Sequence, residues 1–342
     1  MATVDVPQAV GPFKGWINTI SHIVEGGGER DTRACSCDGP SNALAPPKPD
    51  SRASVVVGRY STSNHWSQVV RGAHYSSALH FQPPLRTVPR IFTGLSMLDM
   101  GEDAEDSTIR VDSFPQNVTQ GGFICNGKSW RDTKLYNLSV DWAAIEKPEW
   151  QCGVFKTQEL GEPWEKADSV FDHRVVFPRS FTSLPMVFVC FNGFDLRGNW
   201  NLRTYATNID HTGFNLSIVK SDDGDSSTRL WSASVTWIAI PGDEVLKRKD
   251  VWMGQFGTAR KGEIGGDGSW RGHTDFGFQF RRPPKVFMGL DHFNLSRRRN
   301  LRLRAETTNV TVSGMDWKIS KWHDTMLKGA SVSYLAVDCA DR

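Results

Sequence analysis

The chain repeats one pattern three times, and this repetition limits its fold more than any other feature of the sequence. Equivalent phenylalanines stand at Phe81, Phe177 and Phe276, 96 and 99 residues apart. Each copy opens with a related motif (VGRYST, CGVFKT, MGQFGT) and closes with another (SVDWAAI, SVTWIAI, SVSYLAV). A period of about 95 residues is too long for a solenoid unit and predicts three small complete domains.

The three copies are predicted to cover residues 55–146, 150–241 and 251–339, and we call them repeats 1, 2 and 3. Residues 1–54 lie outside the repeat and are rich in Gly, Pro, Ser and charge. Such a composition cannot bury a core, so a disordered N-terminal tail is predicted. The connectors between repeats, EKPEW and PGDEVLKRKD, are short and leave the domains little freedom.

Within each repeat the local signals indicate β-structure. Segments such as FNLSIV and LRLRAE alternate apolar and polar residues, which is typical of strands. The motifs NVTQGGF, NIDHTGF and NVTVSGM place glycine at hairpin turns. The sequence therefore predicts an all-β chain with about six short strands per repeat, each repeat forming a β-sandwich.

Charge and hydropathy narrow the range of functions. Lys and Arg total 40 against 38 Asp and Glu, a balance that argues against a strongly basic nucleic-acid binder. The sequence has no apolar run near the roughly 18 residues of a membrane helix, so no membrane insertion is expected. The N-terminus lacks the pattern of a secretory signal, and we expect a cytoplasmic or non-classically released protein.

Cysteines and catalytic motifs give little support to a cofactor or an enzyme. Cys35 and Cys37 are predicted to be exposed thiols in the tail, and the other four cysteines to be small buried residues. No metal or other cofactor is expected. The sequence lacks G-x-S-x-G, H-E-x-x-H and P-loop motifs and does not place two acids in one cleft, so we predict a protein without enzymatic activity.

The later half of each repeat carries further related motifs. Repeat 3 carries NLR at Asn300–Arg302 and WHDT at Trp322–Thr325, and repeat 1 carries WRDTKLY at Trp130–Tyr136. Repeat 2 carries NLR at Asn201–Arg203 and STRLW at Ser227–Trp231. The order of these motifs resembles the H-type lectin domain, the family of the snail agglutinin and of the C-terminal half of discoidins. The resemblance implies six-stranded antiparallel β-sandwiches that assemble in threes and bind GalNAc or Gal. One chain would then form an intramolecular pseudo-trimer, open to higher oligomers.

The resemblance also implies where the sugar would bind. Each site would lie at a boundary, with an early Asp from one unit and an Arg, the residue after a Trp and a final aromatic from the next. The residues that match are Arg110, Arg131 and Tyr136 in repeat 1, Arg203, Ser226 and Trp231 in repeat 2, Arg302, His323 and Lys328 in repeat 3, and Asp168 and Asp267 as early acids. Repeat 1 has no Asp at the early position.

These residue types suit a sugar. A carboxylate accepts hydrogen bonds from hydroxyl groups, a guanidinium donates them in a fork, and an aromatic ring covers the apolar face. The sequence-based hypothesis is therefore a lectin, an agglutinin-type glycan binder with a cell-adhesion role. The alternative is a structural or protein-interaction module with degenerate sugar sites, because Lys328 replaces the aromatic and Arg131 and Ser226 replace the His.

Overall fold

The computed structural model describes residues 55–63, 71–101, 108–160, 170–220, 228–258, 263–264, 268–295 and 300–339. The predicted tail, with Cys35 and Cys37, lies outside the described residues. Strands make up most of the described chain, and all pairings between them are antiparallel. The prediction of an all-β antiparallel fold is confirmed.

Each repeat contributes six long strands. Repeat 1 forms β1 (Val55–Ser61), β2 (His74–His80), β3 (Arg90–Gly101), β4 (Thr108–Thr119), β5 (Gly122–Lys128) and β6 (Lys134–Ile145). Repeat 2 forms β7 (Gln151–Lys156), the 3-10 turn η2 (Thr157–Leu160), β8 (Val170–Val176), β9 (Pro185–Arg197), β10 (Trp200–Thr207), β11 (Gly213–Lys220) and β12 (Arg229–Pro241). After helix α2 (Gly242–Arg248), repeat 3 forms β13 (Val251–Gly257), the short β14 (Glu263–Ile264), β15 (Trp270–Asp275), β16 (Lys285–Leu295), β17 (Leu301–Thr308), β18 (Gly314–Lys321) and β19 (Leu327–Val337).

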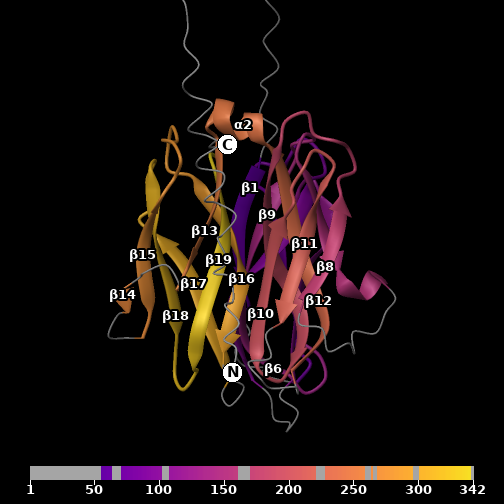
Figure 1. Cartoon of the computed structure of the whole chain (residues 1–342), viewed down its shortest axis with the longest axis vertical. Helices are drawn as coiled ribbons and strands as arrows, with labels where there is room; N and C mark the ends of the chain where they lie inside the picture. Colours follow the sequence, from indigo (N-terminus) through magenta and orange to yellow (C-terminus); the bar gives the residue numbers. More distant parts are fainter. Residues whose placement is uncertain are drawn as a thin grey trace, which may run out of the picture. The chain divides into compact units, whose positions relative to one another are not determined.

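The sheets do not respect the repeat boundaries. One sheet has the order β2-β5-β4-β9-β12-β7, the second β13-β19-β16-β10-β11-β8, and the third β1-β6-β3-β17-β18-β15-β14. Each sheet therefore joins half of one sandwich to half of another, as Figure 1 shows for β10 beside β16 and β19. We call the junction of β4 with β9 the first boundary, that of β10 with β16 the second, and that of β17 with β3 the third.

One irregularity recurs in all three repeats and fixes which residues are equivalent. One residue of β3 is skipped where this strand pairs with β6, and the same holds for β9 with β12 and for β16 with β19. The skipped residues are Ser96, Asn192 and Asp291. A single unpaired residue of this kind is a β-bulge. Counting from these bulges aligns the repeats without reference to sequence motifs.

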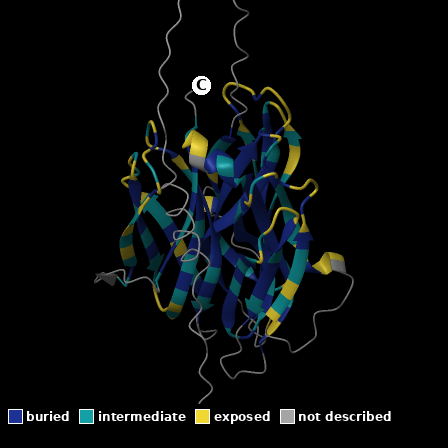
Figure 2. Ribbon diagram, turned by 45° about the horizontal axis from the view of Figure 1, so that its top comes forward, coloured by how far each residue is buried: buried dark blue, intermediate teal, exposed yellow. Residues whose placement is uncertain are grey.

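The three repeats share a hydrophobic core in addition to the cores of the single sandwiches. Phe92, Phe188 and Phe287 each lie four residues before the bulge, and all three belong to one buried cluster. The rings of Phe188 and Phe287 are 5.2 Å apart. Figure 2 shows buried residues along the inner strands and exposed ones at the loops. Burying one Phe contributes about 3–5 kcal/mol, so this core holds the repeats together. A pseudo-trimer needs such contacts, and its compactness in solution stays a prediction.

The backbones come closest two residues before the bulges. A Cβ on Gly94 would lie 2.8 Å from the carbonyl oxygen of Met288 and 3.0 Å from the sulfur of Cys190. Glycine is therefore required where repeats 1 and 3 meet. Cys125 and Cys190 are buried as predicted, whereas Cys152 and Cys339 are only half-buried; all four are free thiols.

Candidate functional site

The first boundary brings a predicted arginine against an acid of the next repeat. Arg110 on β4 stands directly opposite Asp195 on β9, with 3.4 Å between Nε and Oδ2. Its Nη1 also pairs with Asp132 of its own repeat. The Arg110 side chain is only 4% exposed, so the guanidinium lies between two carboxylates and ties repeat 1 to repeat 2.

The same boundary carries Trp130 and Arg131 beside the ion pair. Burial raises the pKa of Asp195, while the charge of Arg110 and a hydrogen bond with Trp130 partly oppose that rise. Arg131 is exposed and adopts a left-handed backbone with φ of 56°. The charge of Arg131 also opposes the rise in the pKa of Asp195, so this exposed residue lies near the ion pair.

The third boundary repeats this arrangement. Arg302 on β17 stands opposite Asp99 on β3, with 3.5 Å between Nε and Oδ1, and its Nη1 lies 2.7 Å from Asp324 Oδ1. His323 has the left-handed φ of 52° that Arg131 has in repeat 1. Arg302 is 16% exposed, so the third boundary is more open to a ligand than the first.

The second boundary lacks the ion pair, and this corrects the predicted alignment. Asn201 on β10 stands opposite Asn294 on β16, while Arg203 stands opposite His292. Asn294 lies three residues after its bulge, as Asp99 and Asp195 do. The NLR motif of repeat 2 therefore sits two residues later than expected, and Asn201 occupies the position of Arg110 and Arg302.

The positive-φ asparagines support the same correction. Three asparagines adopt left-handed backbones at equivalent places: Asn117 near the end of β4, Asn208 directly after β10 and Asn309 directly after β17. Each follows Arg110, Asn201 or Arg302 by seven residues. Arg203 instead matches Arg304, and both lie over rings: Arg203 is 5.4 Å from the Tyr205 ring centre and Arg304 is 5.7 Å from that of Trp322.

The predicted final aromatics do occupy equivalent positions. Leu135, Leu230 and Leu327 pair with Met100, Leu196 and Leu295, so the residue after each leucine is equivalent, namely Tyr136, Trp231 and Lys328. Tyr136 and Trp231 are half-buried and Lys328 is exposed. The Arg229 guanidinium lies 5.9 Å from the Trp231 ring centre. Asp168, Ser226 and Asp267 lie outside the described residues.

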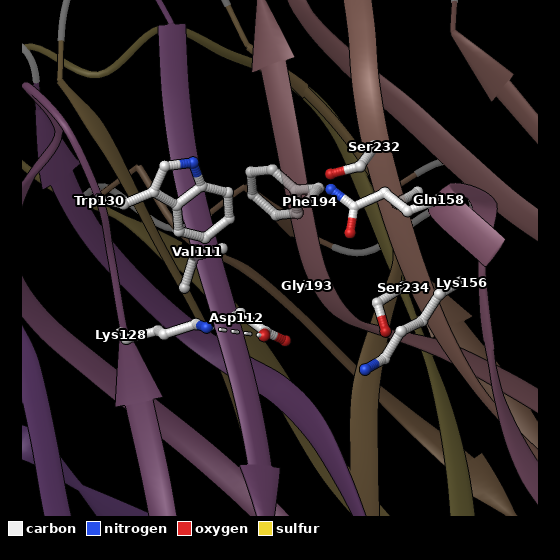
Figure 3. A pocket seen from close by; sticks show the side chains of 11 residues that line it. Val111, Asp112, Lys128, Trp130, Lys156, Gln158, Gly193, Phe194, Ser232 and Ser234 are labelled. Carbon is white, nitrogen blue, oxygen red and sulfur yellow. Dashed lines mark ion pairs between the residues drawn. The ribbon is translucent and has the colours of Figure 1, made fainter. Parts of the chain in front are cut away.

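A groove beside the first ion pair was missed by the sequence analysis. It has a volume of about 220 Å³ and lies over Gly193, between β5 of repeat 1 and β7 of repeat 2. Figure 3 shows Lys128 and Lys156 pointing toward Asp112 from opposite sides, with Trp130 above them. The only signal in the sequence was a glycine where the equivalent residues are Met97 and His292.

Metal and membrane features give no further site. Among the described residues, no group of three or more His, Cys, Asp or Glu is placed to hold a metal ion. No helix in the described part of the chain is long and apolar enough to cross a bilayer.

The described chain is an antiparallel β-sandwich repeated three times, with arginine–carboxylate pairs across the first and third boundaries. The family model of the H-type lectin domain matches residues 76–145, 172–240 and 272–337. The chain therefore belongs to the H-type lectin domain family. Membership in this family supports carbohydrate binding in general and fits a protein without enzymatic activity.

Two individual proteins are also similar to the chain. The first is "ATP synthase subunits region ORF 7" of Fuscovulum blasticum, 34% identical over 71 residues, which cover 21% of this chain and 59% of that protein. The chain thus spans less than two thirds of that relative. The second is the solved structure of discoidin II of Dictyostelium discoideum, with 11% identity and a TM-score of 0.23 over 48% of this chain and 81% of the other. The family model alone carries the assignment.

Proposed function

We propose that the chain binds terminal GalNAc- or Gal-type glycans at the boundaries between repeats, and that the three sites are unequal. The observation that carries the proposal is the ion pair of Arg110 with Asp195 and its counterpart, Arg302 with Asp99. Both arginines stand at the position where the family resemblance implies a sugar-binding Arg. Charged donors and acceptors side by side suit adjacent sugar hydroxyls, each of which both donates and accepts.

The strand pairing suggests which repeats would complete each site. Because β4 of repeat 1 runs beside β9 of repeat 2, the family resemblance implies that an early acid of repeat 2 would complete the first site. By the same argument an early acid of repeat 3 would complete the second site. The sequence candidates for these two acids, Asp168 and Asp267, lie outside the described residues. Repeat 1 offers no early Asp to the third. The first boundary has the fullest set, and we propose it as the main sugar site.

Calorimetric titration of the full chain with GalNAc and with galactose tests the proposal. Tyr136→Ala removes the apolar platform of the first site without touching its ion pair, and an affinity loss of about tenfold is expected from the lost contact area. Lys328→Ala at the equivalent position of the third site is the matched control and should change affinity little. If the wild-type chain binds neither sugar up to millimolar concentrations, the proposal fails. If Tyr136→Ala binds as tightly as wild type, the main site lies elsewhere.

A second candidate is a structural or protein-interaction module, and the burial of Arg110 favours it. Its guanidinium already pairs with Asp132 and Asp195 and exposes only 4% of its side chain. Under this alternative the ion pairs serve only to join the repeats. The chain would then show no sugar binding while still forming the compact pseudo-trimer that small-angle scattering would detect. An extended string of separate domains would contradict both candidates.

A further inference from the structure

The groove at the first boundary carries more positive charge than the neutral sugar requires. We propose that it binds an anionic substituent, a carboxylate or a sulfate ester, of a glycan held at this boundary. This inference rests on the proposed function, because the glycan must already be anchored beside Arg110. The anionic group would lie over Gly193, between the ammonium groups of Lys128 and Lys156.

The charges of the groove favour an anion. Lys128 Nζ lies 3.7 Å from Asp112 Oδ2, and Lys156 also acts on that carboxylate through its charge. Asp112 thus balances one ammonium group and leaves one positive charge in excess. Lys156 is exposed and makes no ion pair with a described residue. An anion entering the groove would bring the local charge to zero.

An unsatisfied hydroxyl is the second observation. Ser234 is 8% exposed, and within the described chain its Oγ has no hydrogen-bond partner. A buried hydroxyl without a partner costs free energy, so a ligand oxygen that accepts its hydrogen bond would be stabilised. Ser234 lines the groove and is paired along the sheet with Lys156. The hydroxyl and the ammonium group can therefore reach the same oxygen atom or neighbouring ones.

The size of the groove fits a substituent of a sugar. A volume of about 220 Å³ is below the roughly 300–1,000 Å³ of pockets for drug-sized ligands. Residue 193 has to be glycine for the Asp112 carboxylate to lie against it, because a Cβ there would be 2.8 Å from Asp112 Oδ1. Trp130 lines the groove and also acts on Asp195, so the groove continues directly from the proposed sugar site.

The repeats themselves indicate that this feature distinguishes the first boundary from the second. At the second boundary Arg203 and Val219 stand where Asp112 and Lys128 stand at the first, and Gly257 matches Lys156. The anion site is thus built from residues that the second boundary lacks. A neutral glycan carries no charge for these lysines to bind.

The test compares lactose, its sulfate ester and its sialylated form as probes for the full chain in calorimetric titration. We expect at least one charged probe to bind about five- to tenfold more tightly than lactose, in the range of charge-assisted hydrogen bonds. Lys156→Gln should abolish this preference and leave lactose binding unchanged. Lys285→Gln, an exposed lysine on β16, is the control of equal charge. The preference should shrink in high salt, which screens exposed charges.

A second variant tests the same groove with the opposite expected effect, a gain in affinity for the charged probe. Asp112→Asn removes the competing carboxylate and should strengthen binding of the charged probe. If lactose binds but neither charged probe binds more tightly, or if Lys156→Gln keeps the preference, this inference is overturned and the proposed function stands. If a charged probe binds and lactose does not, the inference stands and the specificity for neutral galactose fails. If no probe binds, both fail. Preference for one charged form alone identifies sulfate or carboxylate as the group bound.

Discussion

The first and second boundaries use the same backbone register but different chemistry. At the first, Arg110 faces Asp195 across the sheet; at the second, Asn201 faces Asn294 in the equivalent place. Both residues of the facing pair differ between the two boundaries, so neither pair leaves a charged residue facing an uncharged one. A half-buried arginine without its acid would destabilise the chain, whereas a pair of amides does not require a counter-ion. The repeats diverged at this position as pairs across a boundary, not as single residues.

A second difference lies two residues before Asp195 and its equivalents, Asn294 and Asp99. Gly193 at the first boundary corresponds to His292 at the second and to Met97 at the third. Met97 is buried and the His292 ring is half-buried, whereas at the first boundary the carboxylate of Asp112 lies against Gly193 and the groove opens beside it. Burial and the charge of Arg203 lower the pKa of His292 to about 4, so the ring is neutral at pH 7. The second boundary is therefore filled by a neutral ring where the first is hollow and charged.

The largest effect should come from breaking the first pair. Arg110→Ala leaves Asp132 and Asp195 without their cation, and removing one partner of a buried pair costs about 3–5 kcal/mol. Asn201→Ala at the second boundary removes an uncharged amide, for which the described structure shows no side-chain hydrogen bond, and should cost about 1 kcal/mol or less. Urea unfolding of both variants measures the difference. Equal losses would show that Arg110 contributes no more to joining repeats than Asn201 does.

A smaller effect is expected from rebuilding the lost pair at the second boundary. Asn201→Arg and Asn294→Asp should each destabilise the chain, because each places one uncompensated charge in a half-buried or buried position. Combined, they recreate the pair of the first boundary and should recover about 1–3 kcal/mol as coupling energy. A double variant whose loss is the simple sum of the two single losses would show that the second boundary cannot hold an ion pair.

The sequence predicted the strands and the threefold repeat because both are local, periodic signals. It did not predict that each sheet is shared by two repeats, since pairings such as β17 with β3 join residues about 200 positions apart and periodicity is blind to them. Arg203 was misplaced because the NLR motif recurs two residues out of phase. The sequence motifs at these hairpins were used for their turn glycines. Their asparagines Asn117, Asn208 and Asn309, which adopt left-handed backbones, would have given the correct alignment of the repeats. Gly193 differs from the equivalent Met97 and His292, but this difference does not predict a groove from the sequence, because the groove also depends on Asp112 across the boundary.

The bulge position offers a further comparison, between Asp291 in repeat 3 and Asn192 in repeat 2. Asp291 is buried and accepts hydrogen bonds from Ser331, Ser333 and Gln255, the last at 2.7 Å. Burial raises its pKa, and these hydrogen bonds and the charge of Arg203 only partly oppose the rise. The protonated form is thus favoured in the folded chain. The stability that this group contributes is fullest below its unfolded pKa of about 3.9 and falls as pH rises through the folded pKa.

Asp291→Asn should therefore flatten the fall in stability that wild type shows as the pH rises above about 4. At pH 7 the variant should lie within about 1 kcal/mol of wild type, because Asn removes the buried charge but its single carbonyl oxygen can accept the hydrogen bonds of only one of the two carboxylate oxygens. Asn192→Asp in repeat 2 is the reverse change and should introduce such a fall. Thermal unfolding across pH measures both. A parallel pH dependence in Asp291→Asn and wild type would show that Asp291 does not titrate in this range.

The smallest effect concerns the final aromatic, where the first and third boundaries differ by Tyr136 against Lys328. Lys328→Tyr gives repeat 3 the ring of repeat 1, beside an Arg302 that is more exposed than Arg110. A ring stacked on the apolar face of a sugar should add about 1 kcal/mol or less, because only part of the ring would be covered. Titration with GalNAc in a Tyr136→Ala background, which weakens the first site, should then show a gain of up to about fivefold. Lys328→Gln removes the same charge without adding a ring, so an equal gain in that variant would assign the effect to charge and reject the aromatic platform.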